Sequence, residues 1–142
     1  MTSWIIVRRI VNVINLSTPL GLLLAVWGRA RLERGPNGVI VAHGYRSRIP
    51  APRASAVTIG DVVLLRLSRE QLAGRPELLD HEARHCTQWA FFVGPVGFVP
   101  AYLGASVWSW WRCRDFALAN PFEVRAGLVD GGYVRPAEPP QA

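Results

Sequence analysis

The chain is organised around residues 80–88, which read DHEARHCTQ. On a helix, side chains four residues apart lie on one face, so His81 and His85 can present two imidazole nitrogens to one metal ion. Glu82 lies about 100° further round such a helix, where its carboxylate reaches a water on that ion without being a ligand. Metal-dependent hydrolysis needs this arrangement of ligands and base. The alternative interpretation is an exposed helix with two incidental histidines.

The pattern around this stretch predicts a helix over residues 76–93. Pro76 stands at its first position, and Gly94-Pro95 ends it. The two histidines and the glutamate share the side of the helix that carries leucine, cysteine and aromatic residues. Burying such polar groups unpaired is costly, and a metal ion removes that cost. Gln88 continues the histidine stripe, where it could hold a metal ligand or contact substrate, and an ordinary polar residue at the helix edge is an equally good interpretation.

The composition indicates one domain and a charge that is unevenly distributed. The chain has 142 residues, of which 50% are hydrophobic and only 18% charged, so it is long enough for a core. Every basic residue is an arginine, and residues 1–60 carry eight arginines against one acid. A basic first half suits anionic lipid headgroups or an acidic partner. No helix-turn-helix, zinc finger or aromatic–basic RNA motif is present, so we expect no nucleic-acid partner.

The two cysteines, Cys86 and Cys113, are too few for a disulfide framework and form no C-x-x-C motif. Cys86 points off the histidine stripe, which favours a buried thiol over a metal ligand. A reducing compartment is therefore the default expectation, and we predict a cytoplasmic protein.

Two stretches without Asp, Glu, Lys or Arg raise the question of a membrane. They are residues 10–28 and 86–111. Asparagine, serine, threonine and proline interrupt the first stretch, and glycines and prolines interrupt the second, so neither resembles a clean spanning helix. Peripheral membrane contact through Trp108, Trp110 and Trp111 stays open, because tryptophan favours the membrane interface.

The remaining pattern predicts an α+β fold. Residues 1–28 are apolar and helical, Asn37-Gly38 is typical of a hairpin, and Ser68 begins a capping box. Short β-prone runs lie between them, and we expect these strands to be antiparallel. We assign residues 1–135 to a single domain and predict a disordered tail over 136–142.

A third metal ligand is expected because two histidines do not complete a catalytic site. Glu123 is the best candidate, on a helix predicted over residues 121–130 and opened by the N-cap Asn120. The alternative is that Glu123 completes a capping box with Asn120. Asp130 is the runner-up ligand, and His43 the third choice.

Over residues 56–133 the chain resembles small bacterial zinc metallopeptidases of the minigluzincin type. The resemblance rests on H-E-x-x-H-x-x-Q at 81–88, Gly94-Pro95, P-A-Y-L at 100–103 and N-P-F-E-x-x-A at 120–126. It implies a small zincin-like domain in which His81, His85 and Glu123 bind Zn²⁺ and Glu82 is the general base.

A second resemblance points to site-2 intramembrane proteases. Asn120-Pro121 followed by L-V-D-G-G at 128–132 is similar to their N-P…L-D-G element, in which the aspartate is the third ligand, here Asp130. The spacing departs from that pattern, and the chain lacks clean spanning helices. We therefore rank this resemblance second.

The predicted function is zinc-dependent peptide-bond hydrolysis of a peptide or protein substrate. Tyr133, Tyr102 and Arg125 are the candidates to stabilise the oxyanion, and residues 62–67 could form the strand edge on which an extended peptide docks. A catalytically silent zinc-binding or scaffold protein is the first alternative, and a membrane-surface protein is the second. The sequence does not indicate an oligomeric state.

Overall fold

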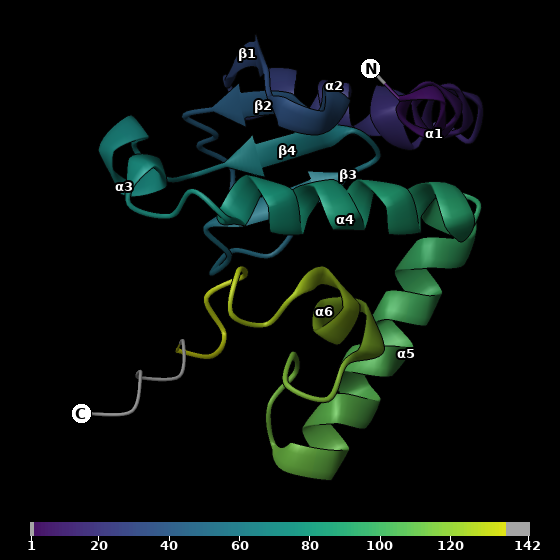
Figure 1. Cartoon of the computed structure of the whole chain (residues 1–142), viewed down its shortest axis with the longest axis vertical. Helices are drawn as coiled ribbons and strands as arrows, with labels where there is room; N and C mark the ends of the chain where they lie inside the picture. Colours follow the sequence, from purple (N-terminus) through teal and green to yellow (C-terminus); the bar gives the residue numbers. More distant parts are fainter. Residues whose placement is uncertain (1, 136–142) are drawn as a thin grey trace.

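A computed structural model describes residues 2–135 and has an α+β fold, as predicted. Figure 1 shows a small sheet lined by helices, with one long helix, α5 (Pro95–Cys113), running away from it. The predicted disordered tail, residues 136–142, lies outside the described residues.

The sheet has four short strands in the order β1-β2-β4-β3. They are β1 (Arg31–Arg34), β2 (Ile40–His43), β3 (Ala56–Ile59) and β4 (Val62–Leu65). The pairs β1–β2 and β3–β4 are antiparallel, as expected, but the central pair β2–β4 is parallel. The prediction of antiparallel strands was therefore wrong for the centre of the sheet. The most apolar strand, β4, takes a central position between β2 and β3.

The turn between β1 and β2 confirms the predicted hairpin. It contains a short 3₁₀ turn, η1 (Pro36–Gly38), in which Asn37 has φ 53° and Gly38 φ 73°. Asparagine and glycine are the residues that adopt such left-handed conformations most readily.

Strand β4 is buried along its whole length because helices cover both faces of the sheet. Val62 and Leu64 face a core shared with α2 (Ser17–Trp27). Val63 and Leu65 face a second core shared with α4 (Leu78–Phe91). Burial on both faces explains why β4 lacks the polar–apolar alternation of a half-exposed strand.

The two N-terminal helices attach to this body through polar residues. From α1 (Ser3–Ile14), Arg8 donates to Asp61 at 2.8 Å in a buried ion pair, and Asn12 donates to the Cys86 carbonyl at 3.0 Å. From α2, Thr18 accepts from the Asp61 backbone N–H at 3.1 Å. Arg8, Asn12 and Thr18 therefore point inward, into the body of the protein.

The two helices that carry the predicted site are shorter than the sequence indicated. Helix α3 (Arg69–Ala73) opens with the predicted capping box. The metal helix, predicted over 76–93, is α4, and α5 (Pro95–Cys113) follows after a short bend. The third-ligand helix, predicted over 121–130, is only α6 (Pro121–Ala126). It ends there because Gly127 adopts φ 100° and leaves helical geometry.

Within the described residues, none of the helices taken singly has the length and apolar character needed to cross a membrane. Two bent pairs meet those criteria together, α1 with α2 and α4 with α5, bent by 73° and 120° respectively.

Candidate metal centre

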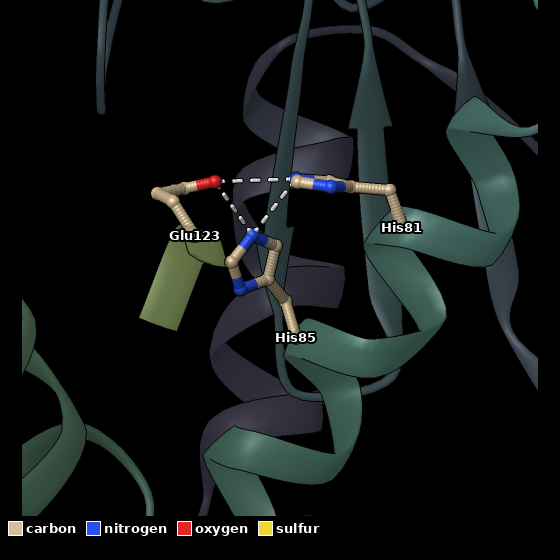
Figure 2. A group of neighbouring side chains, drawn as sticks. All are labelled: His81, His85 and Glu123. Atoms are coloured by element: carbon tan, nitrogen blue, oxygen red, sulfur yellow. Dashed lines mark hydrogen bonds and ion pairs between the residues drawn. The ribbon is translucent and has the colours of Figure 1, made fainter. Parts of the chain in front are cut away.

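Helix α4 places the two predicted histidines one above the other. His81 and His85 are four residues apart, their ring centroids lie 4.7 Å apart, and their Nε2 atoms are separated by 3.1 Å. Figure 2 shows both rings turned toward the same point. This spacing follows from helical periodicity alone, which is why the sequence could predict it.

Helix α6, which is distant from α4 in the sequence, brings Glu123 to the same point. Its Oε2 lies 3.3 Å from His81 Nε2 and 3.4 Å from His85 Nε2. Asn120 forms the predicted N-cap by accepting from the Phe122 backbone N–H. The Asn120 N–H, however, bonds to the Ala117 carbonyl and not to Glu123, so the alternative capping-box interpretation of Glu123 was wrong.

The other two candidates for the third ligand, Asp130 and His43, lie outside this cluster. Asp130 forms an ion pair with Arg84, 2.6 Å apart. His43 faces Glu33 on the β1–β2 hairpin at 3.5 Å. Among the described residues, the group of His, Cys, Asp and Glu side chains close enough to share one ion consists of His81, His85 and Glu123.

The outer ring nitrogens determine which atoms of the histidines face the centre. His81 Nδ1 lies 2.9 Å from the Gly127 carbonyl, which only accepts, so this nitrogen carries the proton in the neutral ring. Gln88 donates its amide to the Phe122 carbonyl at 2.9 Å, which leaves its Oε1 to accept from His85 Nδ1 at 2.8 Å. Both Nε2 atoms of the neutral rings therefore present lone pairs to Glu123.

The three converging atoms fit a metal ion. Two imidazole lone pairs and one carboxylate oxygen form a triangle with sides of 3.1, 3.3 and 3.4 Å. Ligand atoms at ordinary zinc–nitrogen and zinc–oxygen distances, placed tetrahedrally, are separated by about 3.3 Å. Within residues 2–135, Glu123 Oε2 is buried and has no hydrogen-bond donor. A cation at the centre of the triangle would satisfy all three atoms at once.

The electrostatics of the cluster favour an ionised Glu123. Burial alone would raise the pKa of its carboxyl, but hydrogen bonds from His81 and His85 in their protonated form, the positive charge of His85 and a hydrogen bond from Tyr102 hold that pKa well below its ordinary range. Burial opposes the charged form of His85, yet the Glu123 carboxylate and the charge of Glu82 raise the pKa of this imidazole overall. The site is built for positive charge facing a carboxylate.

Tyr102 from α5 fixes the third candidate ligand, Glu123, a role that the sequence did not predict. Its hydroxyl donates to Glu123 Oε1, so the other carboxylate oxygen is the one turned toward the histidines. The Tyr102 hydroxyl is therefore engaged with a candidate ligand, and this contact argues against its predicted role as oxyanion donor. Arg125 lies on the exposed side of α6. Tyr133 lies beside the cluster, with its ring centroid 6.1 Å from that of His81.

Glu82 is buried beside the sheet and is held by a threonine. Thr58 on β3 donates its hydroxyl to Glu82 Oε2 at 2.6 Å. Nothing in the sequence pattern pointed to Thr58, because the contact joins residues 24 positions apart. Cys86 is fully buried in the core, where burial raises the pKa of its thiol, and it takes no part in the cluster.

Residues 127–133 cover one side of the centre. Arg75 donates to the Gly131 carbonyl at 2.9 Å, and Arg84 binds both Asp130 and the Ala126 carbonyl. A Cβ on Gly131 would lie 2.6 Å from His81 Cε1, so only glycine permits this close approach. The three candidate ligands are accordingly 2–7% exposed.

The predicted docking strand is not at an edge. Residues 62–65 form β4, which pairs on both sides, and the outer strand on the α4 side is β3. On β3, the Thr58 carbonyl accepts from the Trp89 indole at 2.9 Å, so this group is already occupied. The expectation of strand addition along residues 62–67 was wrong.

Comparisons of the chain with protein-family models, curated proteins and solved structures gave no match. The resemblance to minigluzincins therefore stays a prediction that rests on the residues themselves.

Proposed function

We propose that this protein is a zinc-dependent metallopeptidase in which His81, His85 and Glu123 hold the ion. The observation that carries the proposal is the triangle of three buried lone-pair atoms, one of which, Glu123 Oε2, has no hydrogen-bond donor in the described residues. Two imidazoles and one carboxylate form a common ligand set of catalytic zinc. When bound, zinc in such a set supplies a Lewis acid to the site.

Glu82 supplies the base. It follows His81 directly on α4, and the Thr58 hydroxyl holds one of its carboxylate oxygens. In the proposed reaction the other oxygen takes a proton from the attacking water and returns it to the leaving amine, so the carboxylate is regenerated. A single hydrogen bond from Thr58 orients the carboxylate without occupying both oxygens.

Of the three candidates to stabilise the oxyanion, Tyr133 is the one that is still available. Its hydroxyl is a donor that can stabilise developing negative charge, and its ring lies next to His81. The half-exposed position of Tyr133 places it between the buried ligands and solvent. Residues 127–133 cover His81, so in the proposed reaction this segment moves before a peptide reaches the ligands.

Burial of the ligands favours a second candidate, a structural metal centre without catalysis. All three side chains are less than a tenth exposed, and they join α4 to α6. An ion there would tie the C-terminal region to the central helix in the manner of a structural zinc site.

The substitution Glu82→Gln separates the two candidates. Zinc-loaded wild type and zinc-loaded Glu82→Gln are incubated with a mixed peptide library, and cleavage is followed by mass spectrometry. The hydrolase proposal predicts cleavage by wild type that falls at least about a hundredfold in the variant, with unchanged zinc content. Equal cleavage by both proteins, or none by zinc-loaded wild type, would favour the structural centre.

A further inference from the structure

The two uncharged stretches of the sequence meet in space at two helix bends. The bend between α1 and α2 falls at Leu16, and the bend between α4 and α5 falls at Val93. They lie side by side, because a Cβ on Gly94 would come within 2.7 Å of the Asn15 side chain. Leu16 and Val93 both have positive φ, of 67° and 61°, which is unusual for bulky residues.

Large apolar side chains are exposed around this junction, which we name the apolar tip. Its members and their exposed fractions are Ile14 74%, Leu16 65%, Phe91 77%, Val93 71% and Val96 87%. Single exposed apolar residues are ordinary, whereas a contiguous apolar patch marks an interaction site.

Two of the helices that lead away from the tip, α2 and α5, bury small and polar residues and expose large apolar ones, which is the reverse of a helix that faces water. In α5, Ser106 and Ser109 are buried, whereas Leu103 and Val107 are 58% and 63% exposed. Helix α2 repeats the pattern, with small and polar residues inside and large apolar residues outside. Its buried residues are Ser17, Thr18, Gly21 and Ala25, and its exposed residues include Leu20, Leu23, Val26 and Trp27. A helix on a water-exposed surface turns its polar residues outward.

The backbone N–H groups at the bends are satisfied within the protein. The N–H groups of Leu16, Val93 and Gly94 donate to backbone carbonyls at 3.1, 3.4 and 2.9 Å. The Asn15 side-chain oxygen accepts from the Ser17 N–H at 3.0 Å. Backbone groups in the hydrocarbon of a membrane must be hydrogen-bonded within the protein, because hydrocarbon offers them no hydrogen bonds.

Tryptophans and arginines lie at the far end of α5. Arg112 lies over the Trp108 ring at 5.4 Å, and Arg114 over the Trp110 ring at 4.5 Å. The helical rise places this end about 24 Å from Val96. Aromatic residues followed by basic ones are typical of the boundary between hydrocarbon and anionic headgroups.

We propose that the apolar tip and the exposed face of α5 insert into a bilayer that contains anionic lipid. The tip would lie in the hydrocarbon, and Arg112 and Arg114 would contact headgroup phosphates. A protein partner fits less well, because protein interfaces carry hydrogen bonds at regular intervals, and the exposed residues of α5 from Pro95 to Val107 have no polar side chain. The inference does not depend on the metal centre.

The test is flotation of the purified protein with vesicles of phosphatidylcholine, alone or mixed with phosphatidylglycerol. Wild type should float with both and bind the anionic vesicles more tightly. Val96→Glu puts a charge on the tip in the first turn of α5, where an acid suits the helix dipole, and should weaken binding at least about tenfold. Leu16→Asn should weaken binding as well and keep the fold, because asparagine suits both a left-handed φ and an N-cap.

Leu32→Glu is the matched control, since Leu32 is 47% exposed on β1, away from the tip. It should bind vesicles nearly as wild type does. Failure of wild type to float with either vesicle would overturn the proposal, and so would equal losses in the Val96 and Leu32 variants. A lipid-free dimer that Val96→Glu dissociates, in a protein that does not float, would assign the tip to self-association instead.

Discussion

Replacing Glu123 by glutamine should remove most of the stabilisation that zinc gives this fold. The carboxylate supplies the only formal negative charge among the three candidate ligands, and its Oε2 is the oxygen turned toward both histidines. Glutamine has nearly the same shape, so α6 keeps its packing. The amide is neutral, and its nitrogen is a donor that cannot ligate a cation.

The expected size of the effect follows from linkage between binding and folding. Zinc at a hundredfold excess over its Kd stabilises a native state by about 2.7 kcal/mol. For a chain of this size, each kcal/mol raises Tm by roughly 2–4 °C. Saturating zinc should therefore raise the Tm of wild type by about 8 °C, and that of Glu123→Gln by less than about a quarter of this.

The assay is differential scanning calorimetry with and without zinc, on wild type, Glu123→Gln and Asp130→Asn. The Asp130 variant is the matched control, because it makes the same carboxylate-to-amide change in the runner-up ligand, whose contact is Arg84. It should keep the full zinc-induced shift. A shift that survives in Glu123→Gln and vanishes in Asp130→Asn would refute the assignment of the third ligand.

Two further substitutions test the supports of the site and of the fold. Gln88→Leu removes the acceptor for His85 Nδ1, so zinc affinity, measured by competition with a chelator, should fall about 10- to 100-fold; unchanged affinity would show that Gln88 does not orient the ring. Asp61→Asn leaves the buried Arg8 guanidinium without its counter-charge, so the free energy of unfolding in urea should fall by about 3–5 kcal/mol; a loss below about 1 kcal/mol would contradict a desolvated pair.

The parts of the site that the sequence predicted correctly are governed by local geometry. His81 and His85 meet because they are four residues apart on one helix, and no long-range information is needed. Asn120 is an N-cap because its side chain bonds a backbone N–H two residues on. Glu123 could be proposed as a ligand, but the sequence left its capping role open, because both roles suit a glutamate three residues after an N-cap.

The parts that the sequence did not predict depend on contacts between distant residues. Tyr102 reaches Glu123 across 21 positions, and Thr58 reaches Glu82 across 24. The parallel pairing of β2 with β4 likewise depends on which strand takes the centre of the sheet. The early end of α6 is different, because Gly127 was a readable stop signal that the predicted range 121–130 passed over.

The two uncharged stretches show how one pattern changes meaning once the fold is known. Read along the chain, residues 10–28 and 86–111 are interrupted too often for a spanning helix. In the structure Asn15 and Gly94 lie at the two bends, which are next to each other, whereas Gly97, Pro100 and Gly104 lie within α5. The prolines and glycines that argued against a spanning helix are therefore compatible with insertion of the apolar tip into a membrane.

The most direct test of the metal centre is zinc K-edge X-ray absorption on protein loaded with one zinc ion per chain. The account predicts a shell of nitrogen and oxygen at about 2.0–2.1 Å, with outer-shell scattering from the imidazoles of His81 and His85. A sulfur shell at about 2.3 Å would mean that a cysteine, Cys86 or Cys113, binds the ion in place of a predicted ligand. That result, or a protein that retains no zinc after dialysis, would contradict the centre formed by His81, His85 and Glu123.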